Sequence, residues 1–347
     1  MEAFLRDVLI GRCGYSAAVV RVEAGGRVVG AAAARDLGEP PVSDASRFDL
    51  ASLTKPFVAT LAARLDAEGR LPLELAIGEV LPEAHSRLAG RTLDDLLRHR
   101  SGLLPWAPLY AREVRSARGF ALTSDALITD PRWWGARRGT YSDLGYVLFG
   151  ATVYAALGST LAELTKEAAG PISVQPGGQP DVVPCRLDTG REVELASRLG
   201  IAIEPLGPPR RGRAQDGNAR TLGGLPGHAG LFADVRALTA LGRAWLAPDR
   251  AGPLGDPLGV ETVARALDGG GRYARGWRRA TRRGSAGPAL GPSAFGHDGF
   301  TGGSLWMDPE RGLLVAMLGH RRDEHLDLGP MRRELHRLGS RLAEEFR

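Results

Sequence analysis

Strand-forming segments at both ends of the chain constrain the fold more than any other feature. Near the N-terminus, "YSAAVVRVEAGGRVVGAAAA" (15–34) holds two β-prone runs around Gly25 and Gly26, which is typical of a hairpin. Near the C-terminus, "GSLWMDPERGLLVAMLG" (303–319) holds another hairpin pattern, with Pro309 second in the turn and Gly312 ending it. One antiparallel sheet built from both chain ends, with a helical part inserted between them, satisfies this order.

Helical patterns occupy the N-terminal end and the middle of the chain. Residues 1–13 space their apolar side chains as a helix does, and residues 52–68 predict a second helix. Thr92 begins a third helix, where Asp95 completes a capping-box pattern. Residues 143–157 predict a fourth, largely apolar helix.

The last segment predicts a terminal helix that packs on the sheet. Its apolar side chains recur on one helical face: Met331, Leu335, Leu338, Leu342 and Phe346. The whole order predicts an α/β fold of the α+β type, with an antiparallel sheet flanked by helices and a mainly helical lobe inserted. We expect one domain over 1–347, with an α/β lobe at about 1–50 and 215–347 and a helical lobe at about 51–214.

The chain is basic, with a net formal charge of +5 and a pI of about 9.6, which raises nucleic acid as a partner. The positive charge is thinly spread, however. Its densest runs lie in Gly- and Pro-rich stretches: Arg210, Arg211 and Arg213, then Arg278, Arg279, Arg282 and Arg283. We interpret both runs as solvated loop charge and predict no nucleic-acid partner.

Cysteine usage and the absence of a targeting pattern predict a cytoplasmic protein. Cys13 and Cys185 show no paired spacing, which favours reduced thiols. Residues 1–16 contain acidic residues and no apolar run of signal-peptide length, and no stretch approaches a membrane span. We therefore expect no membrane partner. The alternative is that a misassigned start codon has removed a signal peptide from the sequence.

One lysine stands three residues after a serine, in "LASLTKPF" (50–57). Lys55 and Lys166 are the only lysines among 45 Lys and Arg residues. Residues three apart share a helix face, so Ser52 and Lys55 should project side by side near the positive end of the helix dipole. A serine hydroxyl needs a base to take its proton, and the pKa of a lysine can fall far enough for that role whereas that of an arginine cannot.

By itself this motif is weak, because chance gives a chain with two lysines an S-x-x-K in roughly one case in ten. Lys55 as an ordinary surface cation at a helix start is the alternative. Lys166 has no serine three residues earlier and is interpreted as solvated helix surface.

A second candidate site residue lies in "YSDLGY" (141–146), at the start of the fourth helix. Nearby cations would lower the pKa of the Tyr141 phenol, which would let it act as a general base. The alternative is a packed tyrosine followed by Ser142 or Asp143 as the helix cap.

A third candidate is "GHDGFTGGSLWMD" (296–308), a glycine-rich strand edge. Gly299, Gly302 and Gly303 would let a backbone N–H approach a substrate closely, as an oxyanion hole requires. His297 adds a polar side chain that can be protonated. The alternative is a glycine-rich start of a strand beside a surface histidine.

Together these segments resemble the serine β-lactamase and penicillin-binding-protein superfamily, in the branch of class C β-lactamases, D,D-peptidases and related esterases. The order of S-x-x-K on a helix, then Y-S-D, then H-x-G on a strand carries the resemblance. Segments between about 48 and 318 look like family segments: "FDLASLTKPF", "TLDDLLRHRSGL", "YSDLGYVLFG", "DGNARTLGGLPGHAGLF" and "FGHDGFTGGSLWMDPERGLLVAML".

The resemblance implies roles for the matching residues. Ser52 would be the acylated nucleophile, Lys55 would hold its proton network, and Tyr141 would be the general base. The backbone N–H groups of Ser52 and Phe300 would form the oxyanion hole. The substrate-binding edge would comprise Gly299, Phe300 and Thr301.

Two positions depart from the family pattern. Asp143 stands where many relatives carry Asn; it would accept a hydrogen bond from Lys55 and stabilise a charged ammonium, but it has no amide to donate to a substrate. His297 stands where lactamases usually carry Lys. It would orient the tyrosine, or bind a substrate carboxylate when protonated.

The remaining histidines are interpreted as structural. His99 is expected to be buried and hydrogen-bonded, and His228 to be a loop histidine, with a site role as the alternative. The glycine-rich segment 223–230 lacks G-K-[ST] and is no phosphate loop. We predict neither a metal nor a cofactor, because no zinc spacing is formed by His85, His320, His325 and His336.

The sequence therefore predicts a serine hydrolase that acts through an acyl-enzyme on small ester or amide substrates. His297 in place of Lys and the missing export signal favour this over the alternative, a D,D-carboxypeptidase or β-lactamase. An alternative of another class is a catalytically inactive binding module. Specificity is expected to reside in the loops 103–140 and 171–220, and the sequence does not predict the oligomeric state.

Overall fold

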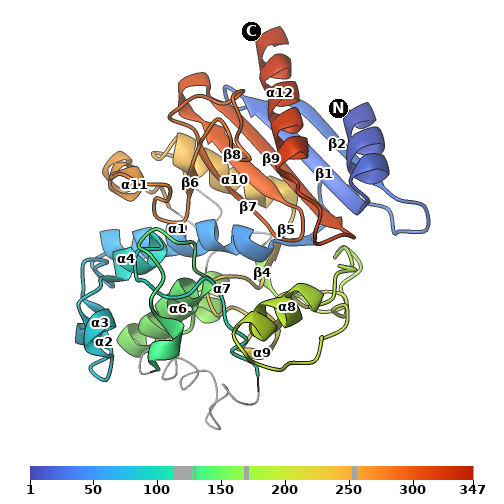
Figure 1. Ribbon diagram of the computed structural model, residues 1–347. Helices are drawn as coiled ribbons and strands as arrows, with labels where there is room; N and C mark the ends of the chain where they lie inside the picture. Colours follow the sequence, from blue (N-terminus) through green and yellow to red (C-terminus); the bar gives the residue numbers. More distant parts are fainter. Residues whose placement is uncertain (112–126, 128–129, 168–171, 252–255, 347) are drawn as a thin grey trace.

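A large antiparallel sheet lies beside a mainly helical part in the computed structural model, which describes residues 1–111, 127, 130–167, 172–251 and 256–346 (Figure 1). Along the sheet the strands are β2 (Arg27–Arg35), β1 (Tyr15–Ala24), β9 (Leu313–Arg321), β8 (Ser304–Asp308), β7 (Phe295–Asp298) and β6 (Arg278–Arg279). Strands β1 and β9 pair side by side although they come from opposite ends of the chain. The predicted sheet from both ends is therefore confirmed.

The predicted helices are present. Residues 1–13 contain η1 (Phe4–Arg12), a π-helix, and residues 52–68 contain α1 (Thr54–Ala67), preceded by the short 3₁₀ helix η2 (Ala51–Leu53). The third and fourth are α4 (Leu93–Leu97) and α6 (Asp143–Leu157), and the Thr92 hydroxyl caps α4 by accepting a bond from the Asp95 N–H at 3.1 Å.

Further described elements lie in the helical part, around the large sheet and between the two. The other helices are α2 (Ile77–Val80), α3 (Ser86–Ala89), η3 (Pro131–Trp133), α7 (Leu161–Glu167), α8 (Gly190–Arg198), α9 (Gly217–Thr221), α10 (Val235–Leu246), α11 (Val260–Leu267), η4 (Pro309–Arg311) and α12 (Gly329–Glu345). A small sheet has the order β3 (Phe48–Asp49), β5 (Leu231–Ala233) and β4 (Ile172–Val174). In the part of the chain that the structure describes, no helix has both the length and the apolar character that crossing a bilayer requires.

Both faces of the large sheet are covered because alternate strand residues point to opposite sides. In β9, one set packs in the core shared with α10: Leu314, Ala316 and Leu318. The other set packs with η1 and α12: Leu313, Val315 and Met317. Met331 and Leu335 are buried there as predicted, but Phe346 is 53% exposed. Its predicted packing was wrong because the last turn of α12 extends past the sheet (Figure 1).

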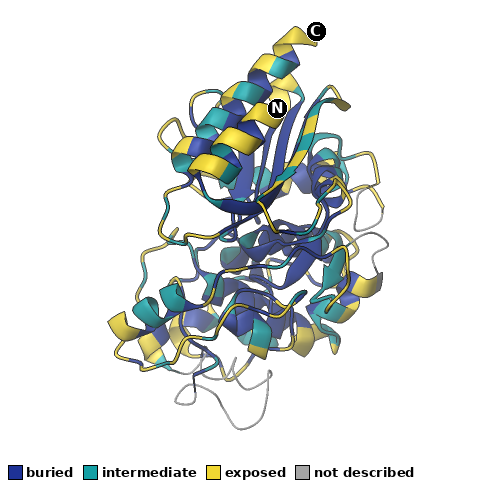
Figure 2. Cartoon of the chain, turned by 90° about the vertical axis from the view of Figure 1, so that its right-hand side faces the viewer, coloured by how far each residue is buried: buried dark blue, intermediate teal, exposed yellow. Residues whose placement is uncertain are grey.

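One hydrophobic core runs from the large sheet into the helical part. It includes Val19 of β1 and Leu305 of β8, Phe57 of α1, and Tyr146 and Phe149 of α6. Figure 2 shows the buried residues continuing from the sheet through the helices below it. The first turn of α1, which contains Phe57, therefore packs in this shared core.

The prediction of solvated loop charge was wrong for part of the second arginine run. Arg278 and Arg279 form the edge strand β6 and are half-buried, and Arg278 pairs with Asp298 at 2.6 Å. Strand β6 joins the sheet beside β7, where Asp298 supplies the counterion. Arg282 and Arg283 are exposed, as predicted.

Part of the loop 103–140, residues 112–126 and 128–129, lies outside the described residues.

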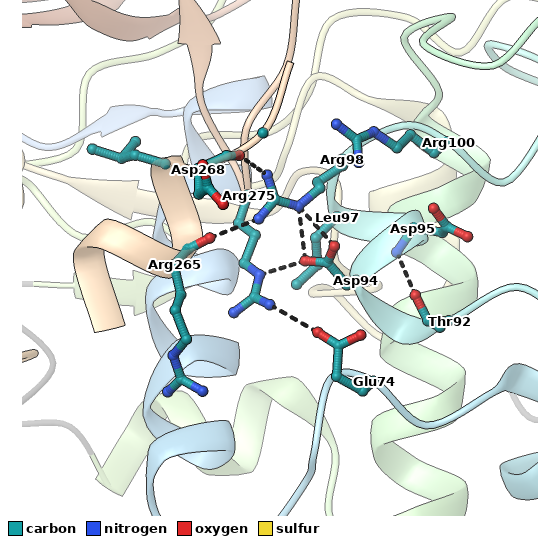
Figure 3. Close-up of polar contacts among 12 residues, drawn as sticks. Glu74, Thr92, Asp94, Asp95, Leu97, Arg98, Arg100, Arg265, Asp268 and Arg275 are labelled. Carbon is teal, nitrogen blue, oxygen red and sulfur yellow. Dashed lines mark hydrogen bonds and ion pairs between the residues drawn. The ribbon is translucent and has the colours of Figure 1, made fainter. Parts of the chain in front are cut away.

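A buried ion-pair cluster fixes the end of α4 against α11 (Figure 3). The carboxylate of Asp94 pairs with Arg98, Nε to Oδ2 at 2.7 Å, and with Nε of Arg275. Both arginine side chains are nearly inaccessible to solvent, at 6% and 4% exposure. Arg275 also pairs with Asp66 at 3.4 Å and with Glu74 at 3.5 Å, so Asp94 is the carboxylate that the two buried cations share.

Replacing Asp94 with alanine is expected to lower the free energy of unfolding by about 3 kcal/mol, because the buried guanidinium of Arg98 loses its carboxylate partner and that of Arg275 keeps only its longer pairs with Asp66 and Glu74. Asp95→Ala is the matched control, because its partner Arg138 is 58% exposed. That change is expected to cost less than about 1 kcal/mol. Urea unfolding of both variants measures the difference, and equal losses would contradict this account.

Candidate active site

Ser52 lies at a sharp turn between β3 and α1. Ala51, immediately before it, has a φ of +45°, a conformation uncommon for a residue with a side chain. Asp49 holds this turn: Oδ1 accepts from the Ala51 N–H at 2.9 Å, and Oδ2 accepts from the Gln215 N–H at 2.7 Å. The Thr301 hydroxyl donates to the Asp49 carbonyl at 2.9 Å. These bonds place the serine at the start of the helix.

Asp49 and Thr301 play parts in this turn that the sequence did not predict. Asp49 was not predicted as a site residue, although it stands three positions before Ser52 in a quoted family segment. Burial raises the pKa of its carboxyl group to about 6. Thr301 was predicted on the substrate-binding edge. Its side chain is buried, at 1% exposure, and its hydroxyl donates to the Asp49 carbonyl in the serine turn.

Lys55 is fully buried directly beneath the serine. Its Nζ lies 3.0 Å from Ser52 Oγ, 3.0 Å from the His228 carbonyl oxygen and 2.7 Å from Asp143 Oδ1. A surface cation, the alternative for Lys55, is thereby excluded, since its exposed fraction is zero. Lys166 is exposed on α7, as predicted. The two lysines thus have opposite environments.

Burial favours the neutral form of both candidate bases. It lowers the pKa of Lys55, against the opposing effect of Asp143. It raises the pKa of Tyr141 well above its usual range, and the negative charge of Asp143 adds to this, while a hydrogen bond with Ser52 opposes it. The sequence predicted that cations would lower the pKa of this phenol. That prediction was wrong, because desolvation and a carboxylate outweigh the cations.

Two cavities meet at Ser52, and both are also lined by Tyr141 and Phe300. The first, about 370 Å³, lies toward the large sheet and includes Gly299, His297 and three arginines, Arg278, Arg321 and Arg332. The second, about 260 Å³, lies toward the helical part and includes apolar Pro105, Trp106 and Leu195 together with Asp143, Glu192 and His228. A substrate carbonyl above the serine therefore has room on both sides.

The glycine at position 299 lets this edge approach the serine turn. A Cβ atom there would lie 2.9 Å from the Leu50 carbonyl oxygen, closer than real contacts allow. The next residue, Phe300, lines both cavities, and the Arg321 guanidinium lies 4.6 Å from the centre of its ring. The structure thus brings Gly299 and Phe300 to Ser52, where the sequence predicted the oxyanion hole.

His297 faces the first cavity as a neutral ring. Its Nδ1 lies 2.9 Å from the Asp298 carbonyl, which can only accept, so Nδ1 carries the proton. Burial, with a further contribution from Lys55, lowers its pKa to about 3. Nε2 is buried and has no hydrogen-bond partner among the described residues. The protonation that carboxylate binding would require is therefore disfavoured, whereas the Tyr141 ring lies within 5.9 Å.

The neutral state of His297 has a consequence for stability at acid pH. The unfolded chain protonates this residue as pH falls through about 6.5, whereas the folded chain does not until about pH 3, so stability is lost over that interval. His297→Asn is expected to reduce the pH slope of the unfolding free energy by up to about 1.4 kcal/mol per pH unit. Urea unfolding at pH 7, 5.5 and 4.5 measures this; parallel curves for wild type and variant would contradict it.

Two further histidines, His99 and His228, contact residues of the site. His99 is buried and its Nδ1 accepts from the Ser142 N–H at 3.0 Å, as predicted. His228 was interpreted as a loop histidine, yet it lines the second cavity, its carbonyl contacts Lys55, and its Nε2 lies 2.9 Å from Asp216 Oδ1. No group of three metal-ligating side chains occurs in the described ranges.

Comparison with known proteins agrees with this geometry. The family model described as Beta-lactamase matches residues 6–338. Esterase EstB of Burkholderia gladioli is 29% identical over 301 residues, which cover 70% of this chain and 76% of the esterase. A protein of Escherichia coli (strain K12) named "Putative D-alanyl-D-alanine carboxypeptidase" is 26% identical over 323 residues, which cover 82% of this chain and 72% of that protein.

Solved structures show the same fold. A class C β-lactamase from Rhodobacter sphaeroides superposes with a TM-score of 0.70 at 19% identity, covering 97% of each chain. EstCE1, described as a hydrolase with promiscuous acyltransferase activity, gives 0.70 at 18% identity and 96% of each chain. The predicted β-lactamase-like fold is confirmed. Because the family model spans nearly its whole length, the chain belongs to the Beta-lactamase family.

Proposed function

We propose that this protein is a serine hydrolase that forms an acyl-enzyme on Ser52 and acts on small ester or amide substrates. The observation that carries the proposal is the position of Ser52 Oγ, 3.0 Å from the buried Nζ of Lys55, at the junction of two cavities. Membership of a family that includes an esterase relative supports it.

Lys55 is proposed to take the proton of the nucleophile. Burial lowers the pKa of Lys55, which makes the amine form more accessible, and that amine accepts the Ser52 proton as Oγ forms a bond to the substrate carbonyl carbon. The ammonium formed in this step is stabilised by Asp143, 2.7 Å away. Asp143 therefore stabilises the positive charge that Lys55 carries after the proton transfer. The backbone N–H groups of Ser52 and Phe300 are the proposed donors to the oxyanion.

Tyr141 is proposed to deliver a proton to the leaving group. Its phenol is neutral, hydrogen-bonded to Ser52, and its ring centre lies 4.9 Å from Lys55 Nζ. As the tetrahedral intermediate collapses, the bond to the leaving group breaks, the phenol gives that group its proton, and the lysine ammonium restores the phenol. Water then attacks the acyl-enzyme, and the same groups return the proton to Ser52.

A neutral His297 favours esters or amides without a carboxylate beside the reacting bond. The second candidate function, D,D-carboxypeptidase or β-lactamase activity, is favoured by one observation: the first cavity contains Arg321, which has no carboxylate partner among the described residues. Its other two arginines, Arg278 and Arg332, pair with Asp298.

A two-substrate comparison separates these functions. Purified wild type and Ser52→Ala are assayed with 4-nitrophenyl butyrate and with a chromogenic cephalosporin. We expect the wild type to turn over the ester faster than the cephalosporin, and Ser52→Ala to turn over neither. Rapid cephalosporin turnover without ester cleavage would establish the second function. No turnover of any ester, amide or β-lactam by folded wild type would favour an inactive binding module.

The cytoplasmic location predicted from the sequence remains part of this proposal. The free thiols of Cys13 and Cys185, both buried, support it, because such thiols persist in a reducing compartment. A small-molecule acyl compound is the proposed partner, without nucleic acid or membrane. Cell fractionation with a cytoplasmic and an exported marker tests the location, and recovery with the exported marker would contradict it.

A further inference from the structure

A third cavity, of about 290 Å³, is lined mostly by arginine side chains. We call it the arginine pocket; it is formed by Arg98, Arg100, Arg138, Gly139, Gly270, Gly271, Arg272 and Tyr273. Tyr273 also lines the first cavity at Ser52, and its ring lies 5.8 Å from that of Tyr141. The arginine pocket therefore begins one aromatic ring away from the proposed catalytic phenol.

One wall of the pocket is rigid. Arg98 is 5% exposed, pairs with Asp94, and donates to the carbonyls of Asp268 at 2.6 Å and Arg265 at 2.8 Å (Figure 3). Arg100 approaches the same place. A Cβ atom built on Gly269 would lie 3.8 Å from Arg98 Nη1 and 3.6 Å from Arg100 Nη2. Both guanidinium groups therefore lie beside Gly269, the neighbour of the pocket residue Gly270.

The pocket holds more positive charge than its carboxylates neutralise. Arg98 pairs with Asp94 and Arg138 with Asp95. Arg100 donates only to the Gly270 carbonyl, at 2.8 Å, and neither it nor Arg272 has a carboxylate partner among the described residues.

Arg279, next to the pocket, adds a third unbalanced cation. It donates to carbonyls of 267–269, and its Nε is buried without a hydrogen-bond partner among the described residues. Burial lowers its pKa, and repulsion from Arg98 and Arg100 lowers it further, while the negative charge of Asp268 opposes this. This repulsion is what a bound anion would relieve.

We propose that the arginine pocket binds a phosphate-type dianion carried by the substrate. The dianion would be on the part of the substrate that extends from the first cavity past Tyr273. The inference rests on the proposed function, since it assigns a substrate class to the same site. Guanidinium groups match the oxygens of phosphate and carboxylate. Several unbalanced cations favour the group with two charges. The substrate class is an acyl ester or amide with a remote phosphate.

The test compares three butyrate esters of one phenol, which carry a phosphate, a carboxylate or a hydroxyl on a short side chain. We expect wild type to have a kcat/KM at least about tenfold higher for the phosphate than for the hydroxyl ester, equal to about 1.4 kcal/mol. The carboxylate ester should lie between them. Arg100→Gln and Arg272→Gln should each reduce the phosphate-to-hydroxyl ratio by about fivefold or more. Neither removes the partner of a buried carboxylate.

Arg282→Gln is the matched control, an exposed arginine outside the pocket, and should leave the ratio unchanged. Equal values for the phosphate and hydroxyl esters, or equal loss in the control, would overturn the proposal, and so would equal preference for carboxylate and phosphate. Calorimetry with Ser52→Ala and the phosphate-bearing phenol measures binding without turnover. Binding that Arg100→Gln weakens would support the pocket even if no ester is hydrolysed, so the two proposals fail separately.

Discussion

Lys55→Met is expected to lower kcat/KM for a small ester by about 10³-fold, because the variant has no group to take the Ser52 proton. Lys55→Arg is expected to lose nearly as much: it keeps the positive charge, but a guanidinium does not give up its proton in proteins. The matched control is Lys166→Met, which changes the other lysine of the chain, exposed on α7. Initial rates with 4-nitrophenyl butyrate measure all three.

The Arg variant distinguishes a proton acceptor from a fixed charge. If Lys55 served only as a cation, Lys55→Arg would retain most of the activity, and the proposed role would be wrong. Thermal unfolding of each variant separates loss of chemistry from loss of folding. Asp143 is 19% exposed, but its Oδ1, which faces Lys55, is buried, so Lys55→Met is expected to lower the free energy of unfolding, and rates are compared below the unfolding transition of each variant.

Tyr141→Phe is expected to lower kcat/KM by about 10²-fold for an ester with a poor leaving group, because the phenol supplies the proton that the leaving alkoxide needs. For 4-nitrophenyl butyrate the loss should be much smaller, because nitrophenolate leaves without a proton. Ethyl butyrate, followed by titration of the released acid, gives the other measurement. Tyr154→Phe, on the exposed side of α6, is the control.

The comparison of leaving groups decides between two roles for Tyr141. A general base for attack would be needed equally for both esters, so an equal loss would return the tyrosine to the role that the sequence predicted. A loss confined to ethyl butyrate supports proton delivery by a neutral phenol, consistent with the raised pKa.

The parts of the fold that local chemistry determines could be predicted from the sequence. Pro309 and Gly312 set the turn between β8 and β9, and Gly312 has the positive φ of 56° that such a turn requires. The Thr92 cap located α4, and the largely apolar composition of 143–157 located α6. Ser52 and Lys55 could be paired because residues three apart share a helix face.

What could not be predicted depends on burial by distant parts of the chain. The pKa directions of Tyr141 and His297 follow from desolvation by the packed lobes, which no local pattern contains. Arg278 was interpreted as loop charge because its counterion, Asp298, is supplied only when β6 pairs with β7. Asp49 supports the nucleophile through Ala51 and Gln215, a contact that joins segments 166 positions apart.

The central claim, that Ser52 is the nucleophile of an acyl-enzyme, is tested most directly by intact mass spectrometry after reaction with a fluorophosphonate. In this reaction Oγ bonds to phosphorus and fluoride leaves. One adduct is expected per folded wild-type chain, mapped to the peptide that contains Ser52, and none on Ser52→Ala. An unlabelled wild type that still hydrolyses ester, or an adduct that persists in Ser52→Ala, would contradict it.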